Sequence, residues 1–227
     1  MQDLKNWKPC PPPAGVTLKG RFVTVEPYER ERHLHALWDG LGQMDINPLL
    51  KYFTQPEFSG IEAFDTWLAS VQKGGWVTEV FRDNGSGRIV GMANYMRPDP
   101  ANGVVEVGGV AHGPAMSRTP LATEAHYLMA KHVFEDLGYR RYEWKCHNDN
   151  KPSHAAAQRY GFTFEGVFRQ HMLSKGENRD TAWYSIIDKE WPVVGKAFET
   201  WLSPDNFNPD GSQKRKLEDI RAELTKV

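Results

Sequence analysis

Residues 117–125 read Ser117-Arg118-Thr119-Pro120-Leu121-Ala122-Thr123-Glu124-Ala125. They join a Val-rich, strand-like run at residues 104–111 to a run with apolar residues at helical spacing that reaches Leu137. A strand, a loop and a helix start in this order offer free backbone N–H groups to an anion. A second helix start follows at residues 150–153, and then Tyr160-Gly161-Phe162. This order predicts a site for a pyrophosphate-bearing cofactor beside a splayed strand.

The size and charge of the chain narrow the classes of protein to consider. Its 227 residues are 40% hydrophobic and 25% charged, which fits one globular domain with a real core. A net charge of -1 gives no overall attraction to nucleic acid or to anionic membranes, so we expect neither as a partner. Cys10 and Cys146 lie in a Pro-rich arm and a predicted strand. We therefore expect two free thiols and a reducing, cytoplasmic location.

The chain divides into three expected parts. Residues 1–16 read as a Pro-rich N-terminal arm, residues 17–203 as the folded domain, and residues 204–227 as a loosely attached tail with a short helix. A loop is expected around Asn47, and no signal peptide or membrane span is apparent. Strands are expected at residues 18–27, 76–81, 89–96, 104–111, 142–146, 162–173 and 181–187. Helices are expected at residues 28–41, 61–73, 121–137, 153–160, 191–202 and 214–224.

Four short motifs occur along this order of elements. They are Val105-Glu106-Val107-Gly108, Ala122-Thr123-Glu124-Ala125, Asn150-x-x-Ser153, and Tyr160-Gly161-Phe162 followed by Glu165-Gly166. Over residues 18–191 the chain resembles the GCN5-related N-acetyltransferase (GNAT) superfamily, in the branch of the ribosomal-protein alanine N-acetyltransferases (RimJ/RimL-like). The resemblance implies an α+β fold. Its central, mostly antiparallel sheet would have six to seven strands, be splayed between strands 4 and 5, and be flanked by helices.

The resemblance also implies acetyl-CoA as co-substrate, with no metal. The family's acyl-CoA loop usually reads Gln/Arg-x-x-Gly-x-Gly/Ala, whereas Ser117 and Pro120 replace its first residue and its central Gly here. Proline lacks an N–H donor but is well tolerated in the first turn of a helix. We expect the cofactor to be bound by Val110, Ala111, His112, Arg118, Thr119, Leu121, Ala122, Thr123, Asn150 and Ser153.

Two residues are the expected catalytic groups. Glu106 would take a proton from the amine through water, although a carboxylate paired with Arg or Lys in the sheet is an equal alternative. His112 is a second candidate base, because an ordinary His pKa lies near working pH. Many family members use a Tyr acid where this chain has Ala157. By resemblance Ser153 takes its place, and a plain helix N-cap is the alternative for Ser153.

These expectations combine into one leading function. The chain is predicted to transfer an acetyl group from acetyl-CoA to a primary amine by direct attack in a ternary complex. The acceptor is a small molecule or a peptide N-terminus, and the nearly neutral charge favours a small amine over a ribosomal partner. A non-catalytic acyl-CoA-binding or sensing module and a scaffold that binds no nucleotide are the alternatives. A homodimer is compatible with all three.

Overall fold

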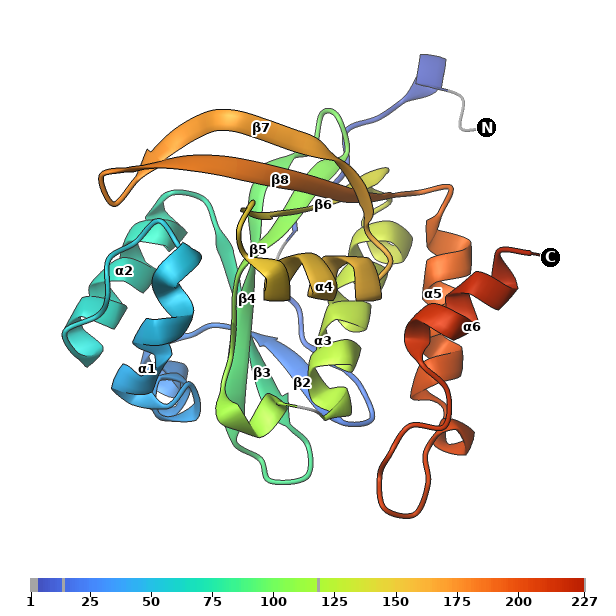
Figure 1. Ribbon diagram of the computed structural model, residues 1–227, viewed down its shortest axis with the longest axis horizontal. Coiled ribbons are helices and arrows are strands. Elements are labelled where there is room, and N and C mark those ends of the chain that lie inside the picture. The colour runs from blue at the N-terminus through green and yellow to red at the C-terminus, as the bar shows by residue number, and fades with distance from the viewer. Residues whose placement is uncertain (1–3, 14, 118, 227) are drawn as a thin grey trace.

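The computed structural model describes residues 4–13, 15–117 and 119–226. The strands form one central sheet, and helices lie on both sides of it (Figure 1). The helices are α1 (Arg30–Gly40), α2 (Ile61–Lys73), α3 (Pro120–Lys131), α4 (Lys151–Arg159), α5 (Trp191–Leu202) and α6 (Leu217–Leu224). The strands are β1 (Leu18–Lys19), β2 (Val23–Pro27), β3 (Val77–Asp83), β4 (Ile89–Asp99), β5 (Val104–His112), β6 (Arg141–His147), β7 (Thr163–Ser174) and β8 (Glu177–Ile187).

The described strands form one eight-stranded sheet in the order β1-β2-β3-β4-β5-β6-β8-β7. Every neighbouring pair is antiparallel except β5 and β6, because α3 crosses over between these two strands and returns the chain in the same direction. The expected mixed fold is therefore confirmed. The expected six to seven strands become eight because the run at residues 18–27 breaks into β1 and β2. The splay predicted between strands 4 and 5 accordingly falls between β5 and β6.

The break in the first strand has a specific cause in α3. The Glu124 carboxylate accepts three backbone hydrogen bonds from the turn between β1 and β2: from Arg21 and Val23 at 2.8 Å and from Phe22 at 2.6 Å. A Cβ at Gly20 would clash with the same carboxylate, so the turn requires a glycine there. Glu124 therefore holds the start of the sheet against α3.

Helices cover the two faces of the sheet unequally. On one face α1 and α2 pack against β3 and β4, and on the other α3 and α5 cover the larger core (Figure 1). Alternation along β3 shows the division, since Val80 lies in the smaller cluster and Phe81 in the larger one. Between α1 and α2 the expected loop is a 3-10 helix, Gln43–Tyr52. Its buried Asn47 side chain bonds both backbone polar groups of Phe58 at 2.9 Å.

The C-terminal tail is more firmly attached than the sequence predicted. Leu217 and Ile220 of α6 are buried against the larger core. The Arg221 guanidinium donates to the carbonyl oxygens of Arg159 and Gln158, both at 2.8 Å, which ties α6 to the end of α4. The expectation of a loose tail was therefore wrong, because the apolar face of this short helix finds a partner. The boundaries proposed for the three parts of the chain stay predictions.

Both cysteines are buried free thiols, as expected. Cys10 fixes part of the N-terminal arm, since its Sγ lies 3.4 Å from the carbonyl oxygen of Gly138. Within the described part of the chain, none of the helices combines the length and the apolar character that crossing a bilayer demands.

One carboxyl group of the sheet is buried without a hydrogen-bond partner in the described part of the chain. Glu79 on β3 is 1% exposed, and within the described residues neither of its carboxyl oxygens has a hydrogen-bond partner. Burial raises the pKa of Glu79 from 4.5 to about 8, because the charged form is poorly solvated there. At neutral pH the folded protein therefore carries Glu79 in its neutral form.

Glu79 makes folding stability depend on pH. Between pH 4.5 and about 8 the unfolded chain ionises this group while the folded chain keeps it protonated. Folding then takes up a proton, so the free energy of unfolding falls as pH rises, by at most about 1.4 kcal/mol per pH unit. We predict that Glu79→Gln removes this loss, so its advantage over wild type grows from pH 5 to pH 8. Urea denaturation across this range tests it, with the exposed Glu62→Gln as control; equal pH dependence for all three proteins would contradict it.

Candidate active site

The site is organised by a gap between two parallel strands. β5 and β6 pair in register from Val104 with Arg141 to Val107 with Trp144. Beyond that point β5 runs on to His112 and β6 to His147 outside the paired register. The two strands thus expose backbone groups toward each other without using them for pairing. An extended ligand arm can add to such edges like a further strand.

A bulge in β5 begins where the pairing ends. Gly108 pairs with Asn94 and Ala111 pairs with Met92, so Gly109 and Val110 together oppose the single residue Ala93. Gly109 has a φ of +56°, and a Cβ there would lie 2.5 Å from the Asn94 side-chain nitrogen. That amide holds the bulge by donating to the carbonyl oxygens of Gly108 and Gly109 at 3.3 and 3.4 Å. The bulge changes the direction of the end of β5.

The start of α3 follows the end of β5 after a short 3-10 turn, Pro114–Met116. Thr119 is the N-cap and Pro120 occupies the first helical position, where a missing N–H costs nothing. The Thr119 hydroxyl donates to the Met116 carbonyl at 2.9 Å and does not cap the helix. The amides of Leu121 and Ala122 belong to the first turn, which has no helical acceptors. Arg118, an expected phosphate ligand, lies outside the described residues.

Thr123 has a structural task that the sequence did not reveal. Its side chain is buried, and its hydroxyl accepts a hydrogen bond from Arg159 at 2.9 Å. This bond connects the first turns of α3 to the end of α4. The role of Thr123 in cofactor binding stays a prediction.

The start of α4 places Ser153 beside the gap. Asn150 is the N-cap, and its side-chain oxygen accepts from the Ser153 amide at 3.2 Å, so Ser153 is not the cap. The Ser153 hydroxyl accepts from the Trp144 indole at 2.9 Å. Burial raises the pKa of the Cys146 thiol, and a hydrogen bond from Ser153 opposes that rise.

Glu106 lies on the opposite face of the sheet from α3, in a chain of ion pairs. The residue is 3% exposed, and its carboxylate is 2.6 Å from the Arg97 guanidinium and 2.9 Å from the Lys145 ammonium. Lys145 is also 2.8 Å from Glu143, which stands opposite Glu106 in register. Lys145 thus separates two like charges that would repel each other. The ion-paired alternative describes this structure, and the role of Glu106 as a base stays a prediction.

His112 does not have the basicity that made it a candidate base. Burial lowers its pKa to about 4, so it is neutral at working pH and a weak proton acceptor. Its ring lies 5.5 Å from that of His126 on α3. Val110 and Ala111 precede it on the bulged end of β5, so these three predicted cofactor-binding residues share one strand end.

The β7–β8 hairpin reaches across the sheet to the 3-10 helix Gln43–Tyr52 (Figure 1). Near its tip the Lys175 ammonium donates to the Leu50 carbonyl at 2.9 Å, and Arg179 donates to the Tyr52 carbonyl at 2.8 Å. Arg179 is also close enough to Glu106 for the carboxylate to affect its pKa, although burial dominates and lowers that pKa. Sequence reasoning missed Arg97, Lys145 and this bridge. The alternating charges of residues 141, 143 and 145 were the one available signal.

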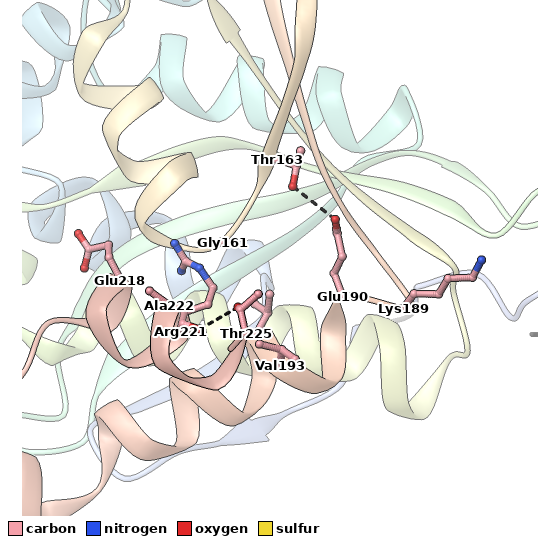
Figure 2. Close-up of a pocket in the computed structure, with 10 residues that line it drawn as sticks. Gly161, Thr163, Lys189, Glu190, Val193, Glu218, Arg221, Ala222 and Thr225 are labelled. Carbon is pink, nitrogen blue, oxygen red and sulfur yellow. Dashed lines mark hydrogen bonds between the residues drawn. The ribbon is translucent and has the colours of Figure 1, made fainter. Parts of the chain in front are cut away.

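Two surface depressions lie elsewhere. One of about 470 Å³ is bounded by α5, α6 and the start of β7, with Glu190, Glu218 and Arg221 around it (Figure 2). The other, of about 650 Å³, is a polar hollow on the β7–β8 hairpin beside Arg169 and Asp180. Neither includes the gap, the first turn of α3 or Ser153. Within the described residues, no group of three or more side chains is arranged to hold a metal ion.

Comparison with known proteins agrees with this geometry. A sequence model of the acetyltransferase (GNAT) domain family matches residues 24–163. The crystal structure of a GCN5-related N-acetyltransferase from Brucella melitensis is 43% identical to the chain, with a TM-score of 0.92. It aligns over 96% of this chain and 100% of that one. A search of curated proteins gave no match.

More distant structures share the fold. The Salmonella typhimurium acetyltransferase that modifies the N-terminal serine of ribosomal protein L7/L12 is 18% identical, with a TM-score of 0.65 over 76% of this chain and 99% of that one. The microcin C7 self-immunity acetyltransferase MccE, solved with acetyl-CoA and AMP, is 24% identical, with a TM-score of 0.62 over 74% and 93%. The match to the domain model and the identity to the Brucella protein confirm the predicted family: this chain belongs to the GNAT acetyltransferases.

Proposed function

We propose that this acetyltransferase moves an acetyl group from acetyl-CoA to a primary amine by direct attack in a ternary complex. The observation that carries the proposal is the parting of β5 and β6 after Val107 and Trp144, next to the first turn of α3. The unpaired strand ends fit an amide-bearing arm, and the first-turn amides fit a pyrophosphate. The residues that would hold the cofactor remain the predicted set.

The charges around Glu106 support an amine as the acceptor. The Arg97 side chain on this carboxylate is 53% exposed, whereas Lys145 is largely buried. A cationic amine can displace the exposed guanidinium and meet the carboxylate in its place. An alkyl amine is mostly protonated at neutral pH, since its pKa is about 10, and it must lose a proton before it can attack. Glu106 accepts that proton through water.

Ser153 supports departure of the thiolate. Its oxygen accepts the Trp144 indole N–H, which leaves its own O–H free to donate. A thiolate leaving group at the gap would offer an acceptor for this donor. Ala157, where many relatives have a Tyr acid, is fully buried and supplies no proton.

A small amine is the acceptor that the enclosure favours. The contacts of Lys175 and Arg179 with the Gln43–Tyr52 helix close one side of the region near Glu106. A bulky folded protein has less access to such a region than a small molecule or a flexible N-terminus. The Salmonella relative acts on a protein N-terminus, so a peptide N-terminus remains the other acceptor of this proposal. A cytoplasmic location and a homodimer remain predictions.

The second candidate is a non-catalytic acyl-CoA-binding module. Two features favour it: the Glu106 carboxylate is neutralised by two cations, and Ala157 replaces the usual Tyr. Either candidate requires the gap and the first turn of α3, so only a measurement of product separates them.

Calorimetric titration with coenzyme A is the first test, followed by thiol-release assays with acetyl-CoA and a panel of amines and peptides. We expect measurable binding, a raised melting temperature on binding, and thiol release with at least one small primary amine. Binding without thiol release across the panel would support the non-catalytic module. Absence of any binding would refute both candidates.

Glu106→Gln is expected to lower kcat by about 10²–10⁴-fold, the usual contribution of a general base, while affinity for coenzyme A stays at the wild-type level. Glu143→Gln is the matched control, because Glu143 is a buried carboxylate that shares Lys145 with Glu106. Its kcat should remain close to wild type. An equal loss in both variants would assign the effect to the ion-pair chain and remove Glu106 from proton transfer.

Ser153→Ala is expected to slow turnover in an enzyme that remains folded, since Asn150 provides the cap of α4. Asn150→Ala, by contrast, should lower the free energy of unfolding by about 0.5–2 kcal/mol through loss of that cap. Steady-state kinetics and urea denaturation of both variants separate the two roles. Unchanged turnover in Ser153→Ala would exclude the hydroxyl from the reaction.

A further inference from the structure

A histidine of α3 forms part of the layer beneath the gap. The His126 ring lies 5.5 Å from that of His112 at the end of β5 and 5.4 Å from that of Trp144 on β6. The Tyr160 ring is 4.7 Å away on a third side. On the α3 face of the sheet, His126 therefore lies between side chains of the two strands whose pairing ends at Val107 and Trp144.

Both ring nitrogens of His126 are buried. The residue is 3% exposed, and neither Nδ1 nor Nε2 has a hydrogen-bond partner within the described residues. The neighbouring Nε2 of His112 is in the same state. Trp144 offers no donor, because its indole N–H is bonded to Ser153. Buried polar atoms are nearly always paired in folded proteins, so an unpaired ring at a ligand gap calls for a partner.

The ring is neutral in this environment. Burial lowers the pKa of His126 well below its ordinary value, and His112 and Arg159 lower it further. A neutral imidazole carries one N–H donor and one acceptor nitrogen. It therefore complements neutral amide or thioester groups, and it has no advantage with a phosphate.

We propose that His126 is a cofactor-binding residue that hydrogen-bonds the pantetheine arm of acetyl-CoA from beneath the gap. The inference rests on the proposed function. The pantetheine arm carries two secondary amides, each with a carbonyl acceptor and an N–H donor, which is the chemistry that the unpaired ring lacks. Glu106 lies on the opposite face of the sheet, so the acceptor amine and His126 meet the cofactor from different sides.

The test compares coenzyme A with phosphoadenosine diphosphate, its nucleotide half without the arm. In wild-type protein, the imidazole nitrogen NMR signals of His126 should shift on binding coenzyme A and stay unchanged with the nucleotide half. His132 is the internal control, since it is also buried with an unpaired Nε2 but pairs its Nδ1 with Asp136 at 2.8 Å. Its signals should not respond to either ligand directly.

His126→Leu should bind coenzyme A about tenfold more weakly, as expected for one lost hydrogen bond, and bind the nucleotide half as wild type does. Its melting temperature without ligand should be equal or higher, because two unpaired polar atoms are removed. His126→Gln, which keeps a donor and an acceptor, should recover part of the affinity. A purely structural role predicts the reverse: lower stability and equal affinity loss for both ligands.

The outcomes separate this inference from the proposed function. Wild-type protein that binds coenzyme A while the His126 signals remain fixed would overturn the role of His126 alone. Wild-type protein that binds neither ligand would overturn the proposed function and this role with it. If His126→Leu does not fold, the NMR comparison on wild-type protein still decides.

Discussion

The loss of pairing between β5 and β6 is the constraint on which the rest of the site depends. Two parallel strands separate only where the loss of their mutual hydrogen bonds is offset by other interactions. The bulge at Gly109 and Val110 changes the direction of β5 at that point. The Asn94 amide fixes the bulge from the neighbouring strand. Ser153, His112 and His126 then surround the opening because α3 and α4 pack beneath it.

The polar groups on the two faces of the sheet have different partners. On the face that carries Glu106, the charges form a continuous chain in which each carboxylate has a cationic partner. On the α3 face, His112 and His126 are neutral, and three of their ring nitrogens are unpaired within the described residues. A cationic amine suits the first environment, since it can exchange with Arg97. An uncharged, amide-rich arm suits the second.

Residues of the recognised motifs hold the fold together as much as they serve chemistry. Glu124 fastens the turn between β1 and β2 to α3 through three backbone amides. Thr123 receives Arg159, and Asn150 caps α4. These contacts set the position of the two helix starts relative to the sheet. An anion site made of backbone amides depends on these contacts, because a backbone amide can change its direction only if the main chain moves.

The sequence alone determined most elements and their order, because hydrophobic periodicity, glycine turns and helix caps are local signals. It placed the start of α3 within one residue for the same reason, at Leu121 where the helix begins at Pro120. The resemblance of its four short motifs indicated the family. Tertiary structure decided which charges pair, which histidines are buried, and that α6 is docked. Those outcomes depend on residues distant in the chain, such as Arg97 with Glu106 or His126 with Trp144, and on desolvation, which only the packed structure creates.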